Sequence, residues 1–353
     1  MADLSIQTSS RNRNWLLMIG AVCFAACSIL LGVLAGAVQV TVPDILNILA
    51  GKIFHVPLYN GEQSTEMIIW EIRFSRVLLA FFVGASLSLA GAAFQGLLQN
   101  PLADPYTIGV SSGASLGAVI IIFFQIQLTV LGHFTLPVIA VLFGMITLLI
   151  VFALTQLASG KLTNETIILA GIIVSSFISA FISLLIALVP REDISQILYW
   201  IMGSVSMRGW GHVQLIFPFF IIGALIILYH YRELNNLALG EQSAQFAGMN
   251  VKTKKTIILI AASILTGSAV AVSGAISFVG LVIPHLVRLL AGPNHRHVLP
   301  LSMLIGGGYL VLADLLARSI ISPKELPIGV ITALIGSPIF TFLLVKNRRQ
   351  KHG

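Results

Sequence analysis

The side chains that could carry out chemistry are few in this sequence, and they form no catalytic set. The chain has 13 Asp or Glu and 8 His, and no His stands in an HExxH sequence, which would place two zinc ligands on one helix face. His295 and His297 flank Arg296, a pattern more typical of a solvated basic turn than of a metal site. We therefore predict no catalytic residue, no metal site and no cofactor bound by this chain.

A nucleotide-binding motif is also missing. A phosphate-binding loop needs GxxxxGK followed by Ser or Thr, because its backbone amides and lysine hold the phosphates and its hydroxyl holds Mg²⁺. The only Gly-Lys pairs are Gly51-Lys52 and Gly160-Lys161, and neither is followed by Ser or Thr. If ATP drives this protein, ATP and Mg²⁺ bind to a separate partner chain.

Ionisable residues are scarce inside the apolar segments. Asp314 and Arg318 are four residues apart near the end of one segment, which is the spacing of an ion pair on one helix face. A proton- or ion-coupled transporter usually places several ionisable groups near the middle of the membrane. Their scarcity disfavours that class and suits a pathway for a bulky, partly apolar cargo.

The elements that must position these residues are transmembrane helices. Hydrophobic residues make up 57% of the chain and charged residues 9%, whereas soluble domains carry about 25% charged residues. About 20 apolar residues span a bilayer as a helix. We predict one all-α membrane domain over residues 1–353, with about ten segments at 15–38, 77–97, 107–127, 135–158, 165–188, 211–231, 256–273, 277–291, 298–318 and 327–345. The eighth segment is short, so a re-entrant half-helix is the alternative there.

Basic residues sort by side when the N-terminus is placed in the cytoplasm. Thirteen of the 20 Lys and Arg then fall inside and 7 outside, as expected because basic residues accumulate on the cytoplasmic side. The net charge of +7 is thus a topology signal and does not indicate a nucleic-acid partner. We predict both termini in the cytoplasm, with a tail over 1–14, a loop over 232–255 and a second tail over 346–353.

Small residues recur every four positions in two of the segments. They are Gly84, Ser88, Ala92 and Gly96 in the second, and Gly109, Gly113 and Gly117 in the third. Because such stripes let helix backbones approach closely in lipid, we expect both helices to be tightly packed.

Specific motifs appear from about residue 70 onward. They include EIRFSRVLLAFFVGASLSLAGAAFQGLLQNPLADPYTIGVSSGA (71–114), ILAGI (168–172), LYWIMGS (198–204), LALGEQSAQFAG (237–248), ISFVGLVIPHLVRLLAG (276–292), LADLLAR (312–318) and ELPIGVITALIGSPIFTFLL (325–344). The set resembles the FecCD/BtuC-like permease family of type II ABC importers for iron-siderophores, haem and vitamin B12. The first 70 residues match only in hydropathy.

The resemblance implies the type II importer permease fold, with about ten helices per subunit in a homodimer. Two ATPase subunits would bind on the inner side, and one periplasmic or lipid-anchored substrate-binding protein would dock outside. The complex would move a ferric siderophore, haem or cobalamin across the bacterial cytoplasmic membrane by ATP-driven alternating access. The permease itself would make and break no covalent bond.

The resemblance also implies three groups of functional residues. Binding-protein docking is carried over to Arg73, Arg76 and Arg318, which our topology independently places outside. ATPase coupling is carried over to Leu239, Gly240, Glu241, Ala244 and Gly248, with Glu241, Ala244 and Gly248 facing the ATPase. The cytoplasmic gate is carried over to Asn100, Pro101 and Leu102, and to Thr163, Asn164 and Glu165.

The second gate match is loose, because Asn164-Glu165 replaces small hydroxyl residues that are common in the family. Glu165 also fits a simpler role, since a carboxylate is favourable at the positive end of the helix that begins there. Two other classes of protein remain as alternatives: a stand-alone secondary transporter or channel, and an intramembrane enzyme. Co-purification with an ATPase distinguishes the first of these from an importer permease.

Overall fold

The computed structural model describes residues 2–36, 40–56, 58–59, 61–160, 162–321 and 324–352. Met1, residues 37–39 at the end of the first predicted segment, Lys161 and Gly353 lie outside the described residues. Within the described ranges all regular structure is helical, which confirms the all-α fold.

Ten apolar helices correspond one to one to the predicted segments. They are α1 (Ala2–Leu34), α4 (Ser75–Leu97), α5 (Val110–Phe123), α6 (Thr135–Ser159), α7 (Asn164–Leu188), α9 (Trp210–Tyr229), α12 (Val251–Ser273), α13 (Val279–Ala291), α14 (His295–Ser319) and α15 (Ile328–His352). Seven are long and apolar enough to cross a membrane, while α5, α13 and the apolar part of α15 are shorter. At about 1.5 Å per residue, α13 rises only about 20 Å, so the eighth segment has the length of a half-helix.

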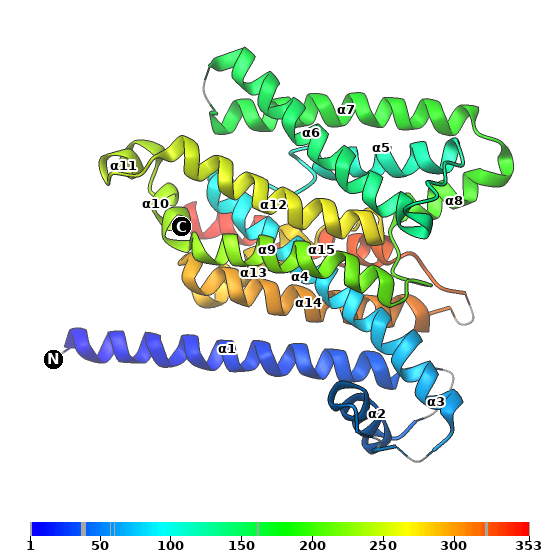
Figure 1. Ribbon diagram of the computed structural model, residues 1–353. Helices are drawn as coiled ribbons and strands as arrows, with labels where there is room; N and C mark the ends of the chain where they lie inside the picture. The colour runs from blue at the N-terminus through cyan, green and yellow to red at the C-terminus, as the bar shows by residue number, and fades with distance from the viewer. Residues whose placement is uncertain are drawn as a thin grey trace.

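The remaining helices lie in the connections. They are α2 (Val42–Phe54), α3 (Gln63–Met67), the π-helical segment η1 (Ile68–Phe74), the 3-10 turn η2 (Gly132–Phe134), α8 (Arg191–Met202), α10 (Tyr231–Ala238) and α11 (Glu241–Phe246). Figure 1 shows both ends of the chain, α10 and α11 at one end of the bundle, and α2, α3 and α8 at the other. The two tails and the loop 232–255 therefore lie at the same end of the bundle, and their placement in the cytoplasm stays a prediction.

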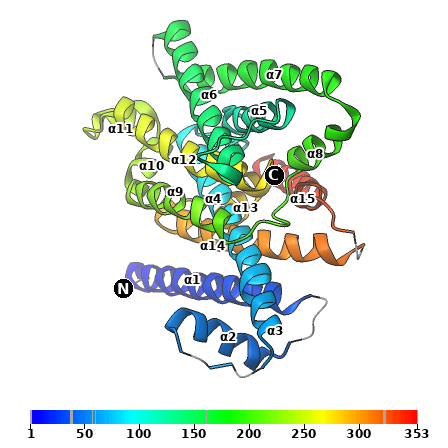
Figure 2. The ribbon, with the colours of Figure 1, turned by 45° about the vertical axis from the view of Figure 1, so that its right-hand side comes forward.

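Helix α4 forms the centre of the bundle. It contacts α9, α12, α13 and α14, and nearly all of its residues are buried. Figures 1 and 2 place α1 along one outer edge of the bundle and α6 and α7 along the opposite edge. The α4 backbone touches its neighbours through glycines: a Cβ added to Gly84 would overlap the Gly306 carbonyl on α14, and one added to Gly91 would overlap Gly280 on α13. The Gly84 contact is the close approach that the small-residue stripe predicts, whereas Gly91 lies outside that stripe.

Helix α5 packs against α6 in the same way. A Cβ on Gly113 would overlap the Thr147 side chain, and one on Gly117 would contact Phe143 at 2.9 Å. The second glycine stripe therefore also marks a close helix contact. In contrast, α7 leaves large apolar side chains exposed along its length, among them Leu169, Ile173 and Phe177.

Candidate functional site

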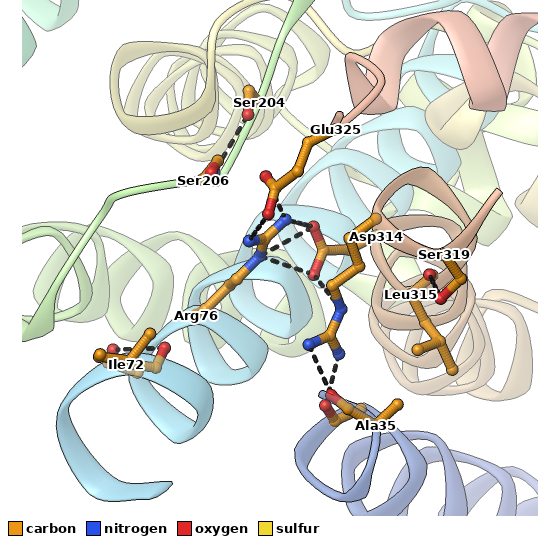
Figure 3. Close-up of polar contacts among 12 residues, drawn as sticks. Ala35, Ile72, Arg76, Ser204, Ser206, Asp314, Leu315, Ser319 and Glu325 are labelled. Atoms are coloured by element: carbon orange, nitrogen blue, oxygen red, sulfur yellow. Dashed lines mark hydrogen bonds and ion pairs between the residues drawn. The ribbon is translucent and has the colours of Figure 1, made fainter. Parts of the chain in front are cut away.

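Two clusters of polar side chains in the described chain contain residues that the sequence analysis singled out, and they lie at opposite ends of the bundle. The first surrounds Arg76, two residues into α4. The Arg76 Nε and Nη2 donate to the Asp314 carboxylate on α14 at 3.0 and 2.8 Å, and Nη1 donates to Glu325 Oε1 at 2.8 Å (Figure 3). Asp314 is buried, and a buried carboxylate is tolerated only when it is paired and hydrogen-bonded.

Arg318 and Arg73 bind the C-terminal end of α1. Arg318 Nη1 donates to the Ala35 carbonyl at 2.9 Å, and its Nη2 donates to that of Gly32. Arg73 Nη1 donates to the carbonyls of Val33 and Leu34 at 3.2 and 3.3 Å. The last carbonyls of a helix have no partner within the helix and carry its negative dipole end, so cations near them are stabilising.

The structure thus brings together the three arginines that the resemblance assigns to binding-protein docking. In this conformation each guanidinium group is bonded within the chain. The i,i+4 pair expected between Asp314 and Arg318 is present at 3.8 Å, but Arg76 is the closer partner of Asp314. Sequence spacing could not reveal the pair of Arg76 and Asp314, because these residues are 238 positions apart.

Glu325 is the most accessible member of this first cluster, with a side chain that is 38% exposed. The hydrogen bond from Arg76 lowers the pKa of Glu325 below its ordinary value. In the sequence it is one outer acidic residue among several, and only its position beside Arg76 distinguishes it. Both of its carboxylate oxygens accept from the Arg76 guanidinium, at 2.8 and 3.1 Å.

The second cluster surrounds Lys255, near the start of α12. Its side chain is 1% exposed, and Nζ donates to Glu241 Oε1 at 2.6 Å, Asn164 Oδ1 at 2.7 Å and the Leu162 carbonyl at 2.8 Å. Glu241 was predicted to couple to an ATPase and Asn164 to belong to the gate. Lys255 enters the sequence analysis only as one of the inner basic residues, and its role in joining these two groups emerges from the structure.

Helix α11 differs from the expectation at Ala244. Its side chain is 1% exposed and faces the chain's own core instead of a partner, whereas Phe246 is 92% exposed. Helical geometry explains the difference, because residues two apart differ by about 200° around the axis. Glu241 and Ala244 lie on the inner side, toward α12, and the exposed Phe246 on the other side was missed. Among the other predicted coupling residues, Leu239 and Gly248 are exposed and Gly240 is half-buried.

The first predicted gate loop follows α4. Pro101 and Leu102 are exposed there, and the Asn100 side chain accepts a hydrogen bond from the Leu102 amide at 2.9 Å. The preceding Gln99 has a positive φ of 52° and donates from Nε2 to the Leu237 carbonyl of α10 at 2.5 Å. The first gate loop is therefore bonded to the same connection, between α9 and α12, that carries α11.

The second predicted gate loop begins α7. Thr163 is its N-cap, and its hydroxyl accepts a hydrogen bond from the Thr166 amide at 3.3 Å. Glu165 is exposed in the first turn, as expected of a carboxylate at a helix N-terminus. Asn164 is bonded to Lys255, so this loop too is connected to the segment around α11.

Two serines match the GxSxG spacing of hydrolase nucleophiles, Ser111 and Ser115. Both lie within α5 and are buried. A nucleophile of that kind lies on a sharp turn between a strand and a helix. Ser111 and Ser115 lie within a helix instead. The contacts of Gly113 and Gly117 with α6 explain the spacing as helix packing.

Comparisons with known proteins agree with this architecture. The model of the FecCD transport family matches residues 23–346. An uncharacterised ABC transporter permease of Bacillus subtilis strain 168, YvrB, is 49% identical over 96% of each chain. The cobalamin import permease BtuC of Halobacterium salinarum is 40% identical over 82% of this chain and 77% of its own.

A solved structure has the same fold. It is described as an inward-facing conformation of an ABC transporter assigned to the metal-chelate type. Its TM-score is 0.81 at 33% identity, and the match covers 93% of this chain and 98% of the other. The resemblance seen in the motifs is therefore confirmed, and the chain belongs to the FecCD transport family as a membrane-spanning permease subunit of an ABC importer.

Proposed function

We propose that this permease carries a bulky metal chelate across the bacterial cytoplasmic membrane, with a ferric siderophore as the first candidate and haem or cobalamin as the others. The observation that carries the proposal is the pair of polar clusters at opposite ends of one apolar bundle: one is suited to a protein partner outside and one to a motor inside. Relatives named for cobalamin and for metal chelates support the cargo class.

Three sets of residues carry this function in the proposal. Arg73, Arg76 and Arg318 receive a periplasmic or lipid-anchored binding protein, because charge pairs at a rim set docking register and on-rate. The segment 239–248 contacts the ATPase, which binds ATP and Mg²⁺. The gate lies at 100–102 and 163–165. The tails over 1–14 and 346–353 and the loop over 232–255 face the cytoplasm.

The proposed contact with the ATPase is supported by the side chains that are exposed at and beside α11. Its exposed Phe246 and the nearby exposed Leu239 are large apolar side chains at the bundle end that carries both chain termini. A few side chains that fill well-packed, desolvated pockets of a partner supply most of the binding energy at protein interfaces. We assign the ATPase contact to these two side chains together with Glu241 and Gly248.

The permease acts as a homodimer in this proposal. Helix α7 supports it, because its exposed apolar side chains form a long outer face and its N-terminus carries half of the gate. ATP closes the ATPase dimer and moves α11, and the two α7 helices then open or close the path between the subunits. The binding protein delivers cargo from the opposite side.

The test is purification and reconstitution with the candidate ATPase and binding protein. We expect a complex with two permeases, two ATPases and one binding protein, and chelate uptake into vesicles that requires ATP. A permease that purifies without an ATPase, with uptake driven by an ion gradient alone, would identify a secondary transporter instead. Ligand binding measured on the isolated binding protein then distinguishes siderophore, haem and cobalamin.

A further inference from the structure

Lys255 is a buried cation held by two other parts of the chain. It belongs to α12, and its partners are Glu241 on α11, and Leu162 and Asn164 in the loop that begins α7. A lysine ammonium has three donors, and the three bonds of 2.6–2.8 Å use all of them. Removing an ammonium from water is costly unless its donors are satisfied, so these parts favour one relative position.

This arrangement has a mechanical consequence. If α11 shifts relative to α12, the Lys255 side chain either loses the Glu241 carboxylate or follows it. If it follows, the α7 loop that is bonded to Lys255 must move together with α11. Losing one partner leaves a buried charge incompletely compensated, which is strongly unfavourable. The lower-energy response is for Asn164 and the start of α7 to follow α11.

Glu241 is placed to receive such a displacement. Its side chain is 35% exposed, so it stays accessible at the edge of α11 while one of its oxygens holds Lys255. At the other end of the link, Asn164 is the first residue of α7, and its side-chain oxygen accepts directly from Lys255. The link therefore runs from an accessible carboxylate through one buried amine to a helix terminus.

We propose that Lys255 is a positioning residue that transmits movement of α11 to the start of α7, and so couples ATP hydrolysis to gate opening. This inference rests on the function proposed above and names a residue that neither the motifs nor the family match assigned. Without Lys255, the complex still assembles and hydrolyses ATP, but less of that hydrolysis opens the gate.

The adjacent lysine provides a matched control. Lys254 Nζ donates to Glu233 Oε1 at 2.9 Å and lies 3.4 Å from His230 Nε2, so both contacts stay within the connection between α9 and α12. Its side chain is partly exposed, and it touches neither Glu241 nor the α7 loop in these contacts. Lys254→Met thus removes a lysine ion pair one residue away from the link.

The experiment measures the ferric siderophore (or whichever of haem and cobalamin the binding protein binds) transported per ATP hydrolysed by the full complex in proteoliposomes. We expect Lys255→Met to lower this ratio at least about fivefold, since coupling between sites typically corresponds to factors of 5–150. We expect Lys254→Met to leave the ratio within about twofold of wild type. An unchanged ratio in Lys255→Met, or an equal loss in both variants, overturns the proposal.

A second measurement covers a Lys255→Met variant that fails to assemble. Glu241→Gln and Asn164→Ala are made singly and together, with Lys255 retained. If both act through Lys255, the double variant loses little more than the worse single variant, because residues in one network are not additive. Fully additive losses overturn the proposal. The wild-type complex tests the function separately, because a lack of ATP-dependent uptake there refutes the importer assignment before any variant is made.

Discussion

Arg76 on α4 and Asp314 on α14 form an ion pair of 2.8 Å that joins two helices far apart in the sequence. Asp314 is buried and faces Arg76 in Figure 3. Arg318 approaches the same carboxylate at 3.8 Å. The same group of side chains also binds the end of α1 through Arg318. One carboxylate thus compensates the charges that connect α1, α4 and α14 at the end of the bundle opposite α11.

The first prediction concerns the stability that Asp314 provides. Asp314→Asn leaves Arg76 and Arg318 largely buried with one counter-ion fewer, and removing one partner of a buried pair typically costs about 3–5 kcal/mol. We expect a clear fall in the thermal unfolding midpoint of the purified protein in detergent. Glu192→Gln, at an exposed site in the first turn of α8, is the control and should lower the midpoint far less. Equal midpoints for Asp314→Asn and wild type would show that the pair is energetically neutral.

The second prediction is a pH dependence at Glu325. Arg76 lowers its pKa in the folded protein, so the folded state holds this proton less tightly than the unfolded state. The stabilisation is fully present above the ordinary glutamate pKa of 4.5 and is lost as the pH falls through the lowered value. Because Glu325 is partly exposed, the effect is small, about 0–1 kcal/mol.

Thermal unfolding of Glu325→Gln and wild type over a pH series checks this prediction. The midpoints should differ near neutral pH and converge as the pH falls below the ordinary glutamate value. Glu71→Gln, at an exposed position of η1 before Arg76, serves as the control. A difference that grows on acidification has the wrong sign and would show that Arg76 does not stabilise the charged form.

The third prediction separates docking from stability at the arginines. Changing Arg73, Arg76 and Arg318 together to Glu should abolish binding-protein docking, but it also disrupts the α1 contacts. The matching triple change to Lys keeps the charges and loses the planar fork that makes two parallel hydrogen bonds. We expect the Lys variant to retain docking while its unfolding midpoint falls.

Docking affinity and unfolding midpoint are therefore measured on both triple variants. Loss of docking in the Glu variant alone indicates that charge at this site binds the partner. Docking that is lost in both, in step with the unfolding midpoint, would mean that these arginines serve only to hold α1, α4 and α14 together. Lys324→Glu, in the loop that also carries Glu325, controls for a general change of surface charge.

The fourth prediction concerns the contact between α4 and α13. A methyl group at Gly91 would overlap the backbone of Gly280, so one helix must move. We expect Gly91→Ala to destabilise the protein by about 1–3 kcal/mol, as overpacking does in tight cores. Gly20→Ala on α1 is the control, because nothing lies near its Cβ and alanine favours a helix by about 0.5–1 kcal/mol over glycine. A neutral Gly91→Ala would show that the two backbones have room to separate.

Hydropathy and local spacing were sufficient to predict much of the fold. All ten apolar segments became helices, because a backbone in lipid must satisfy its hydrogen bonds internally. The glycine stripes predicted which helices pack closely, since small residues are what permits that contact. The short eighth segment was recognised from its length alone and is the 13-residue α13.

The roles of single polar residues depended on the tertiary structure. Asp314 lies closer to Arg76 than to its sequence neighbour Arg318. Glu325 is distinguished only by its hydrogen bond with Arg76, which is 249 positions away. Ala244 faces inward because of the orientation in which α11 packs against α12, and a sequence motif does not encode that orientation. In the sequence Lys255 is one inner basic residue among several. Only the fold shows that its amine is bonded to both the α7 loop and α11. Periodicity is a local property that sequence carries directly, whereas the partners of a buried charge are chosen by packing between segments distant in the chain.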